Sequence, residues 1–302
     1  MNMTSVVVVV PSYGEGEAIL FTLDSIGIAM KNLGLGDCPV FLSDSSPDDL
    51  TVLTARKWAS SSGLHLVVDR SLQRRSLKEA LNAAFEHETV RSQDIVVEVN
   101  ADVVITTESL RALLGALLSD PDCVLAAGMA APDPSYRSLR HRAGAWQLAA
   151  AAATTRQLSP EERGVDGVFW AARGWFTDEF RFAIGSGSIH DDVELSRALL
   201  KRRHRIANVS EAKAYKVPTG SLRDFVSQTT RWQASVKRTR GLVDVRAATQ
   251  TAISDPLGLF MYCLYRVCGS LGRRWLVKDG VVGEAWARQA TTFRSNGNTG
   301  ES

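Results

Sequence analysis

Five consecutive valines, Val6–Val10, lie near the start of the chain and are followed at once by Pro11. Because every residue of the run is β-branched, the run favours a strand, which we expect over Ser5–Val10. No polar residue alternates with the valines, so both faces of this strand should be buried. Helices must then cover both faces of its sheet, and this short run already predicts an α/β fold.

Four later apolar runs have a similar character, and segments of helical period separate them. The expected strands are Val40–Ser43, Leu64–Val68, Ile95–Val99 and Val124–Ala127, with helices at about 15–33, 48–62, 74–88 and 107–118. This alternation predicts a mostly parallel central sheet, doubly wound and flanked by helices. The last of these helices has an N-cap signal in Thr106–Thr107.

The composition fits a packed globular chain and excludes several classes. With 45% hydrophobic residues and a net charge of +2 over 302 residues, it gives no reason to expect a nucleic acid partner. The four cysteines lack metal-ligand spacing, which indicates a reducing, cytoplasmic compartment. We expect neither a signal peptide nor a membrane span, because no run of about 18 apolar residues occurs.

Pro11 and several polar residues follow three of the expected strands directly. They are Pro11, Tyr13 and Glu15 after the first strand, Asp44 after the second, and Asn100 and Asp102 after the fourth. In an open α/β sheet, ligands bind beyond the carboxyl ends of the strands, so these residues are candidates for a binding site. Converging carboxylates repel each other unless a cation or a hydrogen-bonding ligand lies among them. The alternative is that each acid is a helix N-cap or a turn residue.

Two adjacent acids, Asp191 and Asp192, stand in the second half of the chain. They follow the glycine-rich segment GSGSIH and precede an amphipathic helical pattern. One of them could be only the N-cap of that helix. Two acids exceed what a cap requires, and a flexible loop before a helix is a common place for function.

Other nucleotide-binding classes fit the sequence less well. The segment PSYGEGEA after the first strand carries acids where a dinucleotide-binding fold needs its glycine-rich phosphate turn. A sugar-1-phosphate nucleotidyltransferase would need a glycine- and arginine- or lysine-rich loop there, and a P-loop motif is also missing.

Five sequence blocks, in order and spacing, resemble the inverting family 2 glycosyltransferases of GT-A fold. They are VPSYGEGEAILFTLDSI, FLSDSSPDDL, Asn100-Ala101-Asp102, HDDVELSRAL and a QxxRW pattern formed by Gln228, Arg231 and Trp232. The resemblance covers roughly residues 5–240. It implies transfer of a sugar from a nucleotide-diphosphate sugar, with UDP preferred over GDP by analogy alone, to an acceptor hydroxyl.

The resemblance also implies donor-binding roles. Pro11, Tyr13, Glu15, Asp44, Asn100, Ala101, Asp102, Gln228, Arg231 and Trp232 would contact the donor. Asp102 would hold Mn²⁺ or Mg²⁺ on the diphosphate, because these ions prefer carboxylate and phosphate oxygens. Asn100 departs from the family, which usually has Asp there, and so brings no charge. The pair Arg74-Arg75, with Arg75 counted among the donor-binding candidates, could reach a donor phosphate from the opening of a helix or remain a solvated surface. Arg231 and Trp232 could also be structural.

For catalysis, the resemblance implies that Asp192 is the general base, with Asp191 in place of the usual preceding Glu. Asp166 and Gly167 are expected in a loop that faces the acceptor. The acceptor itself, whether a small molecule, a glycan or a lipid-linked molecule, is not indicated. Asn100 keeps open a non-catalytic, sugar-nucleotide-binding protein as an alternative, alongside the nucleotidyltransferase.

The motif order predicts one catalytic domain followed by an appendage. Residues 1–245 would form the catalytic domain, with a nucleotide-sugar half (1–130) and an acceptor half (131–245). A helical appendage (246–293) and a disordered tail (294–302) would follow. The segment 257–278 is apolar with basic residues and Trp at its end, which fits either a peripheral membrane helix or a helix that packs on the domain or forms a homodimer.

Overall fold

The computed structural model describes residues 5–136, 138–157, 165, 167–184, 191–226, 228 and 251–276, with side chains omitted at 154–157, 191, 193 and 268–276. The chain forms two compact units. The first comprises residues 1–130 and 160–214, and the second comprises residues 131–159 and 215–302. Residues 160–214 therefore group with the expected nucleotide-sugar half, and the functional limits at 130, 245 and 293 remain predictions.

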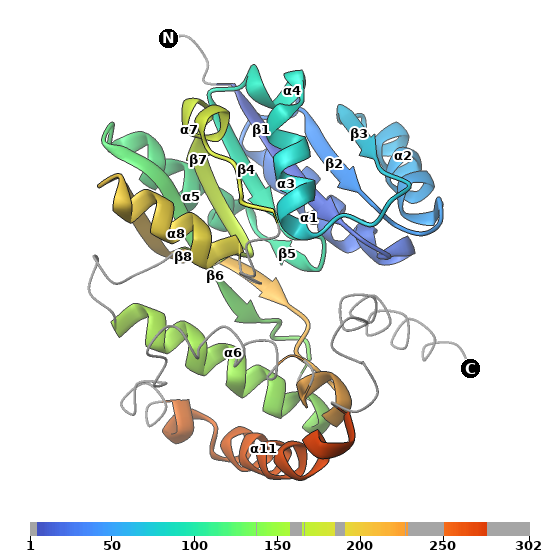
Figure 1. Ribbon diagram of the computed structural model, residues 1–302, viewed down its shortest axis with the longest axis vertical. Coiled ribbons are helices and arrows are strands. Elements are labelled where there is room, and N and C mark those ends of the chain that lie inside the picture. Colours follow the sequence, from blue (N-terminus) through green and yellow to red (C-terminus); the bar gives the residue numbers. More distant parts are fainter. Residues whose placement is uncertain are drawn as a thin grey trace. The chain divides into compact units, whose positions relative to one another are not determined.

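An eight-stranded sheet runs through the described residues (Figure 1), in the order β3-β2-β1-β4-β7-β6-β8-β5. The strands are β1 (Val6–Ser12), β2 (Val40–Asp44), β3 (Leu66–Arg70), β4 (Ile95–Val99), β5 (Val103–Ile105), β6 (Cys123–Pro132), β7 (Phe169–Arg173) and β8 (Arg205–Lys216). The five strands expected from the sequence are all present, and β4 has the expected limits.

The valines of β1 divide between two hydrophobic cores. Val6, Val8 and Val10 pack on one face of the sheet, with residues of α1 (Ile19–Asn32), α2 (Leu50–Ser62) and α5 (Thr107–Ser119). Val7 and Val9 pack on the other face, with residues of α3 (Leu77–Glu86), α7 (Gly174–Glu179) and α8 (Asp191–Lys201). The helices thus cover both faces, as the uninterrupted valine run predicted.

The central sheet is mixed, which confirms the α/β class and corrects one detail of the expected topology. β1 pairs in parallel with β2 and β4, and β2 pairs in parallel with β3. β7, however, is antiparallel to both β4 and β6. The strand expected at Val124–Ala127 is therefore separated from β4 by a strand that arrives later in the chain.

Side-chain bonds to the backbone define several helix starts. Thr106 caps α5 by accepting a hydrogen bond from the Ser109 N–H, as its N-cap signal predicted. Ser76 and Glu79 form a reciprocal capping box at α3. The pKa of Glu79 is lowered, mainly because its carboxylate accepts a hydrogen bond from the Ser76 N–H. A 3-10 turn, η1 (Gly16–Ala18), leads into α1, and α4 (Glu88–Arg91) follows α3.

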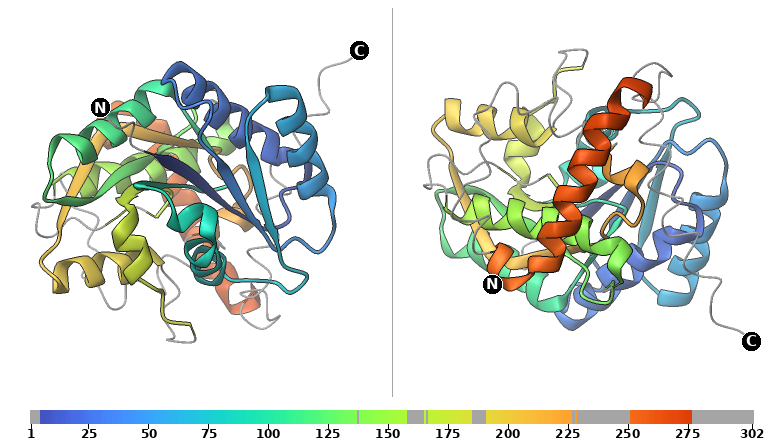
Figure 2. Two further views of the ribbon diagram at one scale, coloured as in Figure 1. Left: turned by 90° about the horizontal axis from the view of Figure 1, so that it is seen from above. Right: turned by 90° about the horizontal axis from the view of Figure 1, so that it is seen from below.

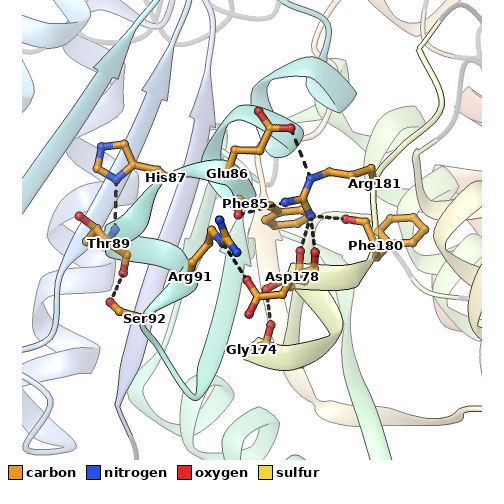
Figure 3. Close-up of polar contacts among 11 residues, drawn as sticks. Phe85, Glu86, His87, Thr89, Arg91, Ser92, Gly174, Asp178, Phe180 and Arg181 are labelled. Carbon is orange, nitrogen blue, oxygen red and sulfur yellow. Dashed lines mark hydrogen bonds and ion pairs between the residues drawn. The ribbon is translucent and has the colours of Figure 1, made fainter.

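Arg181, which follows α7, bonds the end of that helix and contacts α3 within the first unit (Figure 3). Its guanidinium donates to the carbonyl oxygens of Thr177 and Phe180 and lies 3.5 Å from the Glu86 carboxylate. Arg91 of α4 adds a contact of 3.4 Å to Asp178. These bonds hold α7 and the residues directly after it against α3 and α4.

The second unit is built around two helices, α6 (Leu139–Gln157) and α11 (Pro256–Leu276), which contact each other and cross in the view from below (Figure 2). The rings of Trp146 and Tyr262 join them with centroids 4.5 Å apart, and Phe225 packs edge-on to Tyr262. Arg142 bonds Asp255 at 2.9 Å. Among the described residues, no helix has both the length and the hydropathy needed to cross a bilayer.

Candidate functional site

The carboxyl ends of β1, β2 and β4 meet at one edge of the sheet. The parallel register places Ser12 beside Asp44 and Val9 beside Glu98, so the segments after all three strands leave the sheet on the same side. This juxtaposition is what the sequence predicted from the polar residues after these strands. We call the edge, with the segments that follow these strands, the strand-end site.

Asp44 is the most enclosed acid of the strand-end site, with an exposed fraction of 0%. Its Oδ1 accepts hydrogen bonds from the Ser12 hydroxyl (2.7 Å) and the Ser46 hydroxyl (2.6 Å), and its Oδ2 accepts one from the Ser46 N–H (3.2 Å). Asp44 does not cap a helix, because α2 has Asp49 at its N-cap. The local bonds orient the Asp44 carboxylate and provide the partners that a buried charge requires.

The loop after β1 is bonded to the segment after β2. Gly14 and Gly16 both have positive φ angles, +72° and +57°, which glycine adopts without steric cost. Their N–H groups donate to the Ser46 hydroxyl and the Thr51 hydroxyl, each at 2.8 Å. The two glycines thus let the loop turn back so that its amides reach side chains from another strand end. Glu15, between them, is buried, as is Pro11 at the end of β1.

Tyr13, a predicted donor residue, lies beneath an arginine. The Arg74 guanidinium carbon is 4.5 Å from the centroid of the half-buried Tyr13 ring, a cation–π geometry. The neighbouring Arg75, for which the sequence left a donor-phosphate role and a solvated position both open, forms an ion pair with Asp69 of β3. At α3 the Glu79 carboxylate already bonds the Ser76 N–H. A role for Arg75 toward the donor therefore remains a prediction.

The Asn100-Ala101-Asp102 turn links β4 to β5 and is supported by α1. The Thr22 hydroxyl lies 2.8 Å from the carbonyl oxygens of both Ala101 and Val103. Asp102 is half-buried, and Ala101 is buried. Because Thr106 caps α5, Asp102 is not the N-cap of that helix.

Asn100 joins this turn to the segment that precedes β7. Its Nδ2 donates to the Gly167 carbonyl at 3.1 Å, and its backbone N–H donates to the Val168 carbonyl at 3.1 Å. The structure therefore brings together two residues that the sequence assigned to different substrates, Asn100 to the donor and Gly167 to the acceptor.

The start of α8 is bonded to the same segment. The Ser196 hydroxyl accepts from the Val165 N–H (2.7 Å) and donates to the Asp192 carbonyl (2.6 Å). Because α8 begins at Asp191, both acids lie within its first turn, not before it. Lys78 and Glu194 form an ion pair between α3 and α8. Asp192 is thereby held in the first unit, and its side chain is half-buried.

For several predicted site residues, the structure gives no side-chain contact at the strand-end site. Asp166, Arg231 and Trp232 lie outside the described residues, as does the Asp191 side chain. Gln228 is buried within the second unit.

The donor set at the Asn100-Ala101-Asp102 turn suits a hard divalent cation. A half-buried carboxylate and an amide are oxygen ligands of the kind that Mg²⁺ and Mn²⁺ accept. The described residues hold no group of three or more His, Cys, Asp or Glu side chains that could bind a metal. Among the described residues, Asp102 is the one carboxylate of this turn, so an ion there would need further oxygen ligands from a bound ligand or water.

Sequence reasoning missed the contact between Arg74 and Tyr13 and the hydroxyl groups around Asp44. The pair Arg74-Arg75 was predicted to lie near a donor phosphate or in solvent, and nothing local indicated that Tyr13 would lie beneath Arg74. The bonds from Ser12 to Asp44 and from Gly14 to Ser46 each join residues 32 positions apart, so no local pattern encodes them. Thr22 was missed because a threonine within a helical pattern gives no signal of a distant carbonyl partner.

Replacing Ser46 by Ala is expected to destabilise the first unit by about 1–3 kcal/mol. The change removes one donor to a buried carboxylate and leaves the Gly14 N–H without its acceptor. Urea denaturation measures the free energy of unfolding. Ser60→Ala on the exposed face of α2 is the matched control and should stay within about 0.5 kcal/mol of the parent. Equal stabilities for the two variants would contradict the support role of Ser46.

A sequence profile described as "Glycosyltransferase like family 2" matches residues 4–235. Among solved structures, the mannosyltransferase PcManGT from Pyrobaculum calidifontis, solved with GDP-Man and Mn²⁺, is similar at a TM-score of 0.55 and 18% identity, over 96% of this chain and 83% of that one. A mycobacterial protein has a TM-score of 0.50 and 20% identity, over 78% and 74% of the two chains.

A glucosyl-3-phosphoglycerate synthase from Mycobacterium tuberculosis, solved with UDP, has a TM-score of 0.49 and 20% identity, over 78% of this chain and 79% of that chain. No curated protein matches the sequence. At these identities the structural similarities concern the fold.

Proposed function

The chain belongs to glycosyltransferase family 2 and has the GT-A fold, and from this premise we propose that it transfers a sugar from a nucleotide-diphosphate sugar to an acceptor hydroxyl with inversion at the anomeric carbon. The observation that carries the proposal is the strand-end site. There, the segment that holds Asp44 and the Asn100-Ala101-Asp102 turn both follow strands that end at the same edge of the sheet. The mannosyltransferase of the same fold was solved with such a donor, GDP-Man.

The residues around Asp44 would bind the nucleoside. The carboxylate is already oriented by Ser12 and Ser46, so it would contact a ribose or base after a small opening of the loop after β1. Tyr13 and Arg74 would offer an aromatic face and a positive charge at the same end of the donor. We prefer UDP over GDP as the carrier, on family analogy.

Asp102 would hold the divalent ion at the donor diphosphate. When bound, Mg²⁺ or Mn²⁺ supplies Lewis-acid stabilisation of the leaving diphosphate. Asn100 brings no charge to this position, and its Nδ2 is engaged by the Gly167 carbonyl. It would therefore fix the turn and the loop before β7 while Asp102 alone provides a carboxylate.

Asp192 would act as the general base. The acceptor hydroxyl gives its proton to the Asp192 carboxylate as its oxygen attacks the anomeric carbon, and the bond from that carbon to the diphosphate oxygen breaks. The first turn of α8 suits this role, because Ser196 bonds the Asp192 carbonyl and links it to Val165. Asp192 is half-buried, not fully enclosed, as a base that receives a proton from a bound acceptor must be.

A second candidate is a protein that binds a sugar nucleotide without transferring the sugar. The observation in its favour is Asn100, whose neutral side chain takes part in a structural bond where the family usually has Asp. The two candidates predict the same donor binding but differ in product formation.

A donor screen should identify one nucleotide-diphosphate sugar that stabilises the protein with Mn²⁺ present. A selective ligand at 100 times its dissociation constant adds about 2.7 kcal/mol by mass action, which raises the melting temperature by several degrees. Thermal shift with UDP- and GDP-sugars measures binding, and release of nucleoside diphosphate measures chemistry. Binding without release would favour the second candidate, whereas no binding to any donor would refute both.

A further inference from the structure

Helix α11 presents an apolar surface to solvent. Leu257, Phe260, Leu264 and Val267 are exposed large hydrophobic residues, and we call them the exposed stripe. Their exposed fractions reach 61% at Phe260 and 58% at Val267. The alternating spacing of three and four residues places all four side chains on one side of a helix. Ile253, four residues before Leu257, continues the spacing and is also exposed.

The other side of α11 is occupied within the second unit. Met261, Tyr262 and Tyr265 pack against the buried cluster of Ala143, Phe225 and Val226. The exposed stripe is therefore not needed to hold α11 against α6. It is a second apolar surface on a helix that already has its packing partner.

The charges of α11 all have one sign. Between Pro256 and Leu276 the charged residues are Arg266, Arg273 and Arg274, and no acid occurs. The preceding acid, Asp255, is already engaged, since it accepts hydrogen bonds from Arg142 and the Gly258 N–H. A second copy of this helix would thus offer these arginines no unengaged acid from the same segment, whereas an anionic surface would complement them.

We propose that α11 binds the surface of an anionic lipid bilayer through the exposed stripe. Leucine, phenylalanine and valine side chains would enter the interface between headgroups and acyl chains. The Arg266 guanidinium carbon lies 5.9 Å from the centroid of the Tyr262 ring, on the packed side of α11, so attraction to anionic headgroups would come from Arg273 and Arg274 near the end of the helix. A helix of this kind lies in the plane of the membrane and does not cross it. The proposal goes beyond the proposed glycosyl transfer and does not rest on it.

Vesicle co-sedimentation of the full-length protein tests the proposal. The parent should sediment with vesicles of equimolar phosphatidylcholine and phosphatidylglycerol, and less with phosphatidylcholine alone. The triple variant Leu257→Gln, Phe260→Gln, Leu264→Gln should lower the partition coefficient by about tenfold or more, because three apolar side chains no longer enter the interface. Arg273→Gln with Arg274→Gln should remove the preference for anionic vesicles.

The matched control is a triple glutamine variant on α1 and α2 of the first unit. Phe21, Ile28 and Leu53 have exposed fractions of 57%, 61% and 59%, so their replacement removes a comparable exposed apolar area. This control should bind vesicles as the parent does. Thermal unfolding followed by circular dichroism verifies that both triple variants fold.

Three results would overturn the proposal. The first is a parent protein that stays in solution with anionic vesicles, and the second is an α11 variant that sediments as the parent does. The third is a dimer in sedimentation velocity that the α11 variant converts to a monomer, with no vesicle binding by the parent. That result would assign the exposed stripe to contact between copies of this chain.

Discussion

Asp192→Asn is expected to reduce the rate of sugar transfer by roughly 10²–10⁴-fold while donor affinity stays nearly unchanged. The substitution keeps the shape of the side chain and removes its ability to accept the acceptor proton. The Ser196 bond to residue 192 uses the backbone carbonyl, so α8 should keep its position. Single-turnover transfer and donor titration, measured with the donor found in the screen, separate chemistry from binding.

Asp191→Asn is the matched control because the two acids are adjacent in the first turn of α8. It should reduce transfer far less than Asp192→Asn. If the Asp191 variant lost transfer and the Asp192 variant kept it, the base assignment would move to Asp191. Equal losses of transfer and of donor affinity in Asp192→Asn would instead indicate a donor-binding role for that residue.

Asp102→Ala is expected to weaken donor binding in the presence of Mn²⁺ by at least about tenfold, because the one carboxylate of the turn is lost. Binding measured without metal should change little. Calorimetric titration of donor with Mn²⁺, Mg²⁺ and a chelator gives both values. An unchanged metal dependence in the variant would refute the assignment of Asp102.

Asn100→Asp is the informative comparison at the same turn. It adds a second carboxylate, so the difference between donor affinity with and without the metal ion should become larger. It also removes the Nδ2 donor to the Gly167 carbonyl, so a modest loss of stability should accompany the gain.

The sequence predicted the strands of the parallel half of the sheet well, because these strands are uninterrupted apolar runs. It missed β5, which has three residues, and β8, whose alternating pattern follows a basic segment. β7 is the short apolar run FWAAR, and a run of this length fits a strand or a buried helix equally well, so its pattern alone does not assign it. The antiparallel position of β7 could not be inferred from local pattern.

The candidate site, too, was predicted in some respects and not in others. The polar residues after β1, β2 and β4 were predicted, because parallel strands bring their carboxyl ends to one edge. The contact between Arg74 and Tyr13 was not predicted, nor was the bond from Asn100 to Gly167, because each joins residues more than 60 positions apart in sequence. Such contacts depend on how loops meet across the sheet, and no residue pattern within one segment encodes them.

The direction of β7 has a consequence for which parts of the strand-end site can be changed independently. Because β7 is antiparallel to β4, with Val99 beside Phe169, its amino end meets the carboxyl end of β4. The segment before β7 therefore reaches the Asn100-Ala101-Asp102 turn and supports Asn100 with two main-chain carbonyls, those of Gly167 and Val168. Main-chain carbonyls are present whatever side chains the segment carries. The side chains of this segment could thus be changed while its support of the turn is retained.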